Sequence, residues 1–132
     1  MEVKPFDIAA HMVHMCKWLY LRDAYIPSKD EMPAIGYIAY SDNKPVAVAF
    51  LRKMEGNHAL LDGIASNPDA TSEERHQAID MVMESVVNTA KELKIKSILG
   101  YTRDESTFLR SIRHGFVQSP HAVLVKDLSV EV

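Results

Sequence analysis

Cysteine is nearly absent from this sequence: Cys16 is the only one among 132 residues. A single thiol cannot form a disulfide within the chain, which favours a reducing compartment, so we expect a cytoplasmic protein. Long apolar runs are also missing, since a run such as Val46 to Leu51 falls far short of the roughly 20 residues that span a bilayer. The N-terminal segment from Met1 to Pro5 lacks the apolar core of a secretory signal. We therefore expect neither a membrane span nor a signal peptide.

An excess of positive charge is absent as well. The chain has 15 Lys and Arg against 18 Asp and Glu, a formal net charge of −3. General nucleic-acid binding needs many uncompensated cations, so we do not expect nucleic acid as a partner. The 47% hydrophobic and 25% charged content is that of an ordinary soluble globular protein. The length fits a single domain over residues 1–132.

Hydrophobic periodicity and turn residues predict the order of helices and strands. Ile8, Met12, Met15 and Leu19 recur at helical spacing. The predicted elements are a strand at 2–5, a helix at 6–23, strands at 35–40, 46–53 and 58–66, a long helix, a strand at 96–102, a helix at 105–113 and closing strands at 116–118 and 122–128. The order β-α-β-β-β-α-β-α-β is a mixed α+β fold, with an antiparallel meander followed by a βαβ C-terminal half.

The start of the long helix is the most informative region for function. A buried strand that ends near Ser66 is followed by a loop and then by this helix. The N-terminus of a helix presents free backbone N–H groups, which suit an anionic ligand such as a pyrophosphate. The loop lacks the glycines that such sites usually carry. Thr71 and Glu74 fit a capping box, which would start the helix near Ser72.

Two short motifs, together with the element order, carry a family resemblance. Arg75, Ala78 and Asp80 match in part the pattern Arg/Gln-x-x-Gly-x-Gly/Ala, and 113–116, Arg-His-Gly-Phe, matches Lys/Arg-x-Gly-Phe. The chain resembles the GNAT (Gcn5-related N-acetyltransferase) superfamily over almost its whole length. Its small size and degenerate signature are similar to GNAT-like proteins of phages. The resemblance implies one GNAT-like domain, 1–132, that binds acetyl-CoA.

The resemblance also implies which residues would bind the acyl donor. Amides of the bulged strand would polarise the thioester, and amides at the helix start would hold the pyrophosphate. The corresponding residues here are Ile64, Ala65 and Ser66 in the strand, and Arg75, His76, Gln77, Ala78, Ile79 and Asp80 at the helix. Asp80 adds a negative charge near the expected phosphate. Since the capping box lies before this signature, either the helix begins later or the phosphate site is built differently.

For catalysis, Asp62 is the nearest carboxylate to the bulged strand. It could act as a general base, directly or through water, or be a structural hydrogen-bond acceptor; strand alternation puts it on one face with Leu60 and Ile64. His58 is a second candidate base, although a turn position is the simpler interpretation. Many members have a general-acid Tyr four residues before the Gly of the Gly-Phe motif, and this chain has Ser111 there.

The first predicted helix offers no metal site, because His11, His14 and Cys16 do not share one face and no fourth ligand is evident. Its apolar residues, such as Met15 and Trp18, are expected to pack in the core or to line an acceptor pocket. The rim of that pocket would be Tyr20, Arg22, Asp23 and Tyr25.

Two functions follow from the resemblance. The first is an acyl-CoA-dependent N-acyltransferase that transfers acetyl directly to a small-molecule or protein amine. The alternative is a catalytically silent GNAT-like module that binds a protein partner or acts in an assembly; a homodimer is left open. An enzyme requires the strand edge beside Ile64 to stay open as a cleft, with Ser66, Tyr101 and Phe108 as further lining. A silent domain is expected to close it.

Overall fold

The computed structural model describes residues 1–129 and has the α+β architecture that the sequence predicts. Contacts divide the chain into two compact units, Met1–Tyr101 and the part from Thr102 onward. The first unit contains β1 (Glu2–Pro5), α1 (Ile8–Leu21), a short 3₁₀ turn η1 (Lys29–Glu31), β2 (Ile35–Ser41), β3 (Lys44–Lys53), β4 (His58–Ser66), α2 (Ser72–Glu92) and β5 (Ser97–Leu99). The second unit contains α3 (Glu105–Arg113).

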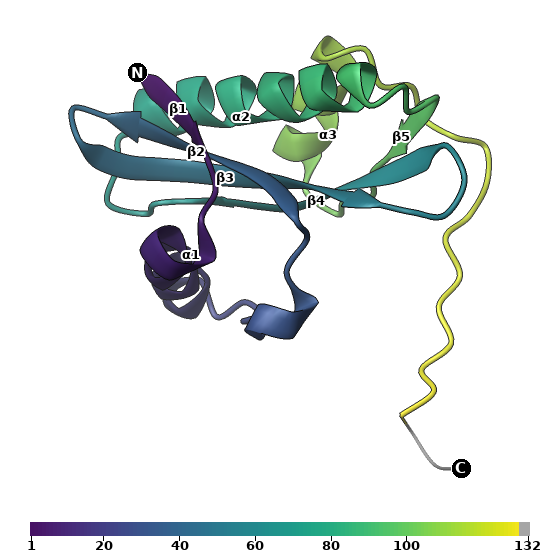
Figure 1. Cartoon of the computed structure of the whole chain (residues 1–132), viewed down its shortest axis with the longest axis horizontal. Helices are drawn as coiled ribbons and strands as arrows, with labels where there is room; N and C mark the ends of the chain where they lie inside the picture. Colours follow the sequence, from purple (N-terminus) through teal and green to yellow (C-terminus); the bar gives the residue numbers. More distant parts are fainter. Residues whose placement is uncertain (130–132) are drawn as a thin grey trace. The chain divides into compact units, whose positions relative to one another are not determined.

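The strands form one sheet in the order β1-β2-β3-β4-β5 (Figure 1). The pairs β1–β2, β2–β3 and β3–β4 are antiparallel, as expected for the meander, and β4–β5 is parallel. Asp42 and Asn43 turn the chain between β2 and β3 with φ of 48° and 64°. Asn and Asp tolerate this left-handed conformation, which matches the twist of a tight hairpin.

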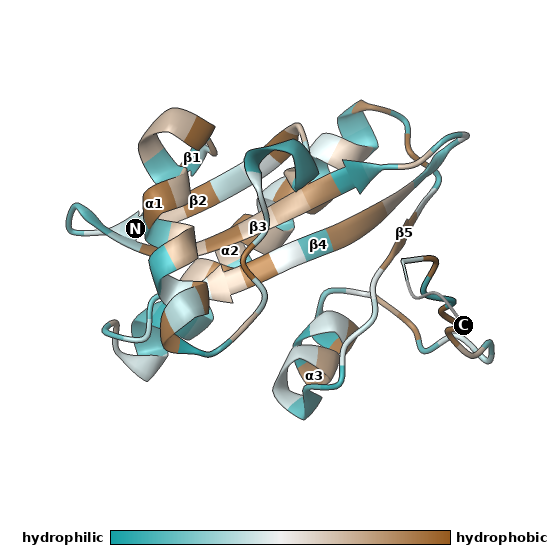
Figure 2. Ribbon diagram, turned by 90° about the horizontal axis from the view of Figure 1, so that it is seen from below, coloured by the Kyte–Doolittle hydropathy of each residue, from teal (hydrophilic) through white to brown (hydrophobic). Residues whose placement is uncertain are grey.

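One helix covers each face of the sheet. Figure 1 shows α2 along one face and α1 against the other, and the colouring of Figure 2 shows apolar residues running along β2, β3 and β4 between them. The α2 face buries a cluster that includes Ala47, Ala49, Leu51, Val82 and Val86. The α1 face buries a second cluster, made of Met12, Met15, Trp18, Ile38, Val48, Phe50 and Ala65.

Helix α2 begins where the capping box predicts. Thr71 is the N-cap, its hydroxyl accepts from the Glu74 N–H, and the Glu74 carboxylate accepts from the Thr71 N–H. Both bonds satisfy donors that a helix start would otherwise leave unpaired. In the described part of the chain, no helix is both long enough and apolar enough to cross a membrane.

The C-terminal strands are the error in the predicted elements. Residues 116–118 and 122–128 form no strand in the part of the chain that the structure describes. Val117, Leu124 and Val125 are instead highly exposed, at 87%, 91% and 89%. β propensity reflects packing against a neighbouring strand more than an intrinsic backbone preference. An apolar composition was therefore insufficient evidence for a strand here.

Candidate functional site

The centre of the candidate site is a β-bulge in β4. Ala65 pairs with Val48 and Asp62 pairs with Phe50, so Gly63 and Ile64 together lie opposite one residue of β3. Gly63 has a φ of +65°, which favours glycine, and a Cβ there would lie 2.8 Å from Cδ2 of Phe50. The bulged strand that the family resemblance implies is therefore present, and the Phe50 ring packs where a side chain at Gly63 would lie.

The bulge changes the regular alternation that we expected along β4. Ala65 belongs to the cluster on the α1 face, whereas Ile64 packs partly against the cluster on the α2 face. Asp62 and Ile64 nevertheless line the same pocket, on the side of the bulge. Their proximity thus comes from the local twist of the bulge and not from a two-residue repeat.

Beyond Leu60, β4 has a free edge. Its parallel pairing with β5 is confined to His58 with Ser97, Ala59 with Ile98, and Leu60 with Leu99. Asn67 N–H donates to Val46 O at 2.7 Å, so the backbone groups of the preceding residue, Ser66, point away from β3. No strand of the described residues pairs with this edge from 61 to 66. This is the open arrangement expected beside Ile64 for an enzyme.

Arg22, which follows α1, lies at this free edge. Its Nε and Nη2 approach the Ser66 carbonyl at 3.4 and 3.3 Å, and Nη2 lies 3.2 Å from Ser66 Oγ. The predicted rim residue therefore contacts the strand itself. The backbone N–H of Ser66 is not involved in these bonds.

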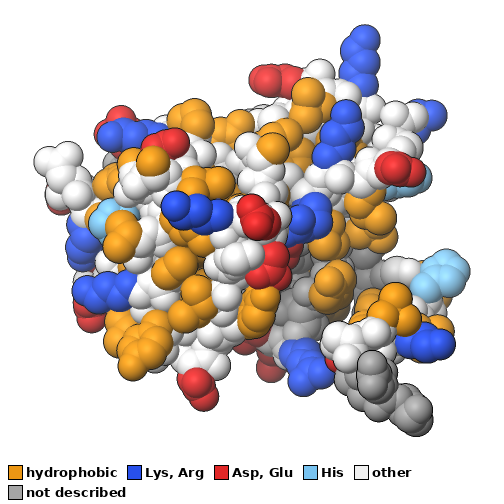
Figure 3. Space-filling view, turned by 60° about the horizontal axis from the view of Figure 1, so that its bottom comes forward, with side chains coloured by type: hydrophobic (Ala, Val, Ile, Leu, Met, Phe, Trp, Pro, Cys, Tyr) orange, Lys and Arg blue, Asp and Glu red, His pale blue; other side chains and the backbone are white. Residues whose placement is uncertain are grey.

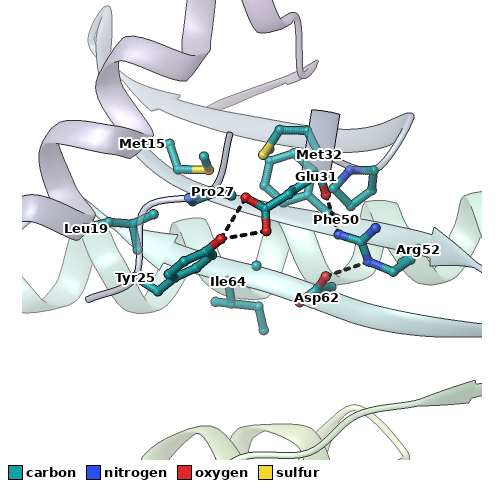
Figure 4. A pocket seen from close by; sticks show the side chains of 12 residues that line it. Met15, Leu19, Tyr25, Pro27, Glu31, Met32, Phe50, Arg52, Asp62 and Ile64 are labelled. Carbon is teal, nitrogen blue, oxygen red and sulfur yellow. Dashed lines mark hydrogen bonds and ion pairs between the residues drawn. The ribbon is translucent and has the colours of Figure 1, made fainter. Parts of the chain in front are cut away.

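A pocket of about 240 Å³ lies on the α1 side of the bulge (Figure 4). Its apolar lining comes from α1, the loop after α1, β3 and β4, and includes Met15, Leu19, Met32, Phe50 and Ile64. Its polar lining is Tyr25, Glu31, Arg52 and Asp62. The structure thus agrees with the expectation that the first helix and the loop after it line a pocket.

The polar groups of this pocket are linked to one another. Arg52 Nε contacts Asp62 Oδ2 at 2.9 Å, and Arg52 Nη2 donates to the Glu31 backbone carbonyl at 2.7 Å. The Tyr25 hydroxyl lies 2.7 and 2.6 Å from the two Glu31 carboxylate oxygens. The Ser28 N–H and then the Tyr25 hydroxyl hold the pKa of Glu31 below its usual range, and Glu31 in turn raises the pKa of Tyr25. Glu31 is therefore held as a carboxylate.

The loop before α2 leaves few amides for an anion. Helix α2 starts at Ser72, so the predicted phosphate-binding residues from His76 to Asp80 lie inside the helix, where N–H groups bond to carbonyls four residues earlier. Ala78 is fully buried against the sheet. The helix begins at Ser72 and not within the family signature, so the first of our two alternatives is wrong. A phosphate site would therefore need other residues than those of the signature.

The remaining amides near the helix start are mostly used within the protein. Those of Asp69 and Ala70 donate to Asn67, and that of Arg75 donates to the Thr71 carbonyl. The Arg75 side chain is also turned inward, because its Nη1 donates to the Ala70 carbonyl. Thr71 and Glu74 complete the capping box. Among the described residues, the amides without an acceptor at this helix start are those of Ser72 and Glu73.

The other predicted catalytic residues belong to the far end of β4 and to the second unit. His58 begins β4, at the end opposite the bulge, and its Nδ1 contacts the Ser97 hydroxyl. Ser111 lies in α3 of the second unit, where its hydroxyl donates to the Thr107 carbonyl at 2.8 Å. Phe108 is in that unit as well, and Tyr101 ends the first unit with 70% exposure.

Sequence reasoning missed Glu31 and Arg52. Glu31 carried a readable signal, since Ser28 and Glu31 have capping-box spacing, and the structure forms that box at η1. Arg52 carried none, because its role depends on the loop after α1 folding over β3. On the face presented in Figure 3, Lys and Arg side chains are scattered among acidic and apolar ones rather than gathered into one basic surface.

Comparisons with known proteins were made at the level of sequence and of structure. No protein-family model and no curated protein matches the sequence. Among solved structures, a GNAT-family acetyltransferase from Streptococcus pneumoniae has a TM-score of 0.69 at 13% identity, covering 95% of this chain and 97% of that one. An aminoglycoside 6′-N-acetyltransferase from Acinetobacter haemolyticus has a TM-score of 0.62 at 20% identity, covering 96% and 98%. Rv2747 from Mycobacterium tuberculosis, in complex with CoA, has a TM-score of 0.68 at 13% identity, covering 95% and 76%.

Proposed function

Since the chain has the fold of the GNAT acetyltransferases, we propose that it is an acyl-CoA-dependent N-acyltransferase. The amine nitrogen attacks the thioester carbonyl carbon, the new N–C bond forms as the C–S bond breaks, and CoA leaves as its thiolate. The observation that carries the proposal is the free edge of β4 beside the bulge, where the backbone of Ser66 faces outward and the same strand lines a pocket.

In this proposal, the free edge binds the acyl donor. The N–H groups of Ile64 and Ser66 are available to hydrogen-bond the thioester or the adjoining amide-containing arm. Ala65 is less suited, because its pairing with Val48 turns its backbone toward β3. Of the three predicted strand residues, we therefore propose Ile64 and Ser66 as the donors.

The donor's phosphates fit less well. Ser72 and Glu73 supply two N–H groups at the start of a long helix, where an anion is favoured. Asp69, Glu73 and Glu74 place carboxylates around the same helix start, and these repel a phosphate. We therefore expect acetyl-CoA to bind through the β4 edge and these two amides, with an affinity lowered by the acidic surroundings.

Asp62 is proposed as the base that receives the amine proton, directly or through water. It lines the pocket beside Gly63 and Ile64, and Arg52 pairs with one of its oxygens and leaves the other for an incoming group. Ser111 is a weak candidate for the acid because its hydroxyl already donates within α3. A thiolate can take its proton from water in its place.

One observation favours the alternative of a silent module that binds a protein partner. Most amides before α2 are bonded internally, and the first helical turn carries Glu73 and Glu74. A chain that no longer binds a phosphate can retain such a loop without cost to its activity. Direct measurement of donor binding separates the two functions.

The experiment is calorimetric titration with acetyl-CoA. Ser72 is the first residue of α2, a position that accepts proline, and Thr71 before it is already extended with φ of −67° and ψ of 158°. Ser72→Pro therefore deletes one proposed phosphate donor while keeping the helix. We expect Ser72→Pro to weaken acetyl-CoA binding about 5- to 10-fold, the scale of one charge-assisted hydrogen bond.

Ser72→Ala is the matched control, since it removes the hydroxyl and keeps the N–H. It should bind acetyl-CoA as the parent does. Parent protein that shows no binding at millimolar acetyl-CoA would contradict the enzyme proposal and favour the silent module. Equal binding by the parent and Ser72→Pro would remove the helix start from the donor site.

A further inference from the structure

The pocket beside the bulge has walls that select an apolar ligand body. Met15 and Phe50 are 2% and 1% exposed, so the pocket has a buried apolar wall. Leu19 and Met32 add apolar surface from α1 and from the loop. A group that enters these walls loses its hydration, so additional charged groups on the ligand would be penalised.

The charges around this pocket do not cancel. Arg52 pairs directly with Asp62, whereas the hydrogen-bond donors to the Glu31 carboxylate are neutral, the Tyr25 hydroxyl and the Ser28 N–H, and the Arg52 charge is a lesser cause of the lowered Glu31 pKa. Glu31 is held ionised by those two donors, so the four polar lining groups carry a net charge of −1, from two carboxylates and one guanidinium. Asp62 Oδ1 has no hydrogen-bond partner among the described residues. The pocket therefore offers one unbalanced negative charge and one unused carboxylate oxygen above an apolar floor.

We propose that this pocket selects a small primary monoamine with an apolar body, and that this is the class of acceptor for the transfer reaction. The inference rests on the proposed function for the role of the amine, but the binding itself does not depend on it. A volume of about 240 Å³ holds a compact molecule. Polyamines carry several ammonium groups, which one net negative charge does not balance and which the apolar walls cannot hydrate.

The test measures amine binding in the absence of any acyl donor. The probes are 2-phenylethylamine, its uncharged counterpart 2-phenylethanol, and spermidine, each titrated into the purified chain by calorimetry. We expect 2-phenylethylamine to bind at least 10-fold more tightly than either other probe. Glu31→Gln keeps the side-chain size and removes the unbalanced charge, and it should weaken 2-phenylethylamine about 5- to 10-fold. Glu55→Gln, in the turn after β3, is the matched control and should have no effect.

A second variant guards against an indirect effect of Glu31 on the loop. Leu19 is half-buried in α1 and lines the pocket, so Leu19→Trp should fill the pocket without disturbing the core. This variant should no longer bind the amine, and its circular dichroism spectrum should be that of the parent. Equal affinity for 2-phenylethanol, tighter binding of spermidine, or unchanged binding by Glu31→Gln would each overturn the proposal. Amine binding without acetyl-CoA binding would contradict the proposed enzyme and leave the pocket's selectivity standing. Acetyl-CoA binding without amine binding would contradict the pocket's selectivity and leave the proposed enzyme standing.

Discussion

Single residues decide the geometry of the site, and Gly63 is the clearest case. Its positive φ shapes the bulge, and its missing Cβ makes room for the Phe50 ring. The sequence alone suggested the bulge, because a glycine inside a strand commonly marks one. The contact with Phe50 could not be foreseen, since it depends on the register between β3 and β4.

Gly63→Ala should therefore destabilise the protein by about 2–4 kcal/mol, from left-handed strain and overpacking together. Gly56→Ala is the matched control: Gly56 also has a positive φ, of 83°, but nothing lies within 4 Å of its virtual Cβ. Gly56→Ala should lower the free energy of unfolding only by the left-handed strain, about 1–2 kcal/mol. Urea denaturation with an unchanged slope measures both. Equal costs for the two variants would show that Phe50 yields to the methyl group.

Asp62 tests the chemistry at the same scale. Asp62→Asn should leave acetyl-CoA affinity unchanged and lower the rate of acetyl transfer about 10²-fold, the usual scale for loss of a general base. Loss of its ion pair with Arg52 should cost stability little, because both side chains are partly exposed, at 43% and 37%. Glu55→Gln, in the turn after β3, is the control with an unchanged rate. A full rate for Asp62→Asn with an amine that the parent acetylates would exclude Asp62 as the base.

Among elements, α2 was the most predictable and the C-terminal segment the least. The capping box is a local signal, so it predicted the start of α2 correctly. The hairpin turn at Asp42 and Asn43 was equally local. The predicted closing strands would each need a neighbouring strand to pair with, and the sequence of the C-terminal segment alone does not show whether one is present. The hydrogen bonds made by the backbone N–H groups of the loop before α2 could not be predicted either. They depend on Asn67 as an acceptor and on a helix that starts before the family signature.

The start of α2 predicts a pH effect. The Thr71 N–H, with Ser41 and Lys44 next in effect, lowers the pKa of Glu74 from 4.5 to about 2. A carboxyl whose folded pKa is depressed stabilises the protein above its unfolded pKa, and this contribution is lost as the pH falls from 4.5 to about 2. Glu74→Gln should therefore lose less stability than the parent across that window and be the less stable protein at neutral pH.

Glu73→Gln is the control for that experiment, because Glu73 shares the first turn but not the capping box. Its loss of stability on acidification should follow the parent's. Chemical denaturation at about pH 6 and about pH 3 provides the comparison. Identical acid profiles for the parent and Glu74→Gln would mean that Glu74 keeps its bonds in the unfolded ensemble or lacks them in the folded one.

At the scale of the molecule, the sequence predicted the fold class and the meander, whereas the polar network of the pocket escaped it. The fold follows from periodicity within each segment. The network joins Tyr25 and Glu31 in a loop to Arg52 and Asp62 on two strands, so it exists only after tertiary packing. Asp62 could be singled out as a carboxylate beside a bulge, but its partner could not.

Hydrogen exchange should separate the two ends of the chain. Within the buried stretch from Val46 to Leu51, the residues Ala47, Val48, Phe50 and Leu51 pair with both β2 and β4, so the amides of this stretch should exchange slowly. The amides from Val123 to Val125 have no strand partner among the described residues and should exchange close to the unprotected rate. Protection in the second group comparable with that in the first would mean that the predicted closing strand forms in solution.

Among the residues that the structure describes, the fully buried apolar side chains lie between Met12 and Ala90. Protein synthesis delivers the chain from its N-terminus, so both core clusters are complete in sequence once Ala90 has left the ribosome. The meander and α2 can then pack before β5 has emerged, leaving only its short parallel register with His58, Ala59 and Leu60 to be added. A nascent chain stalled so that α2 has emerged while β5 is still inside the exit tunnel should already resist proteolysis within the meander.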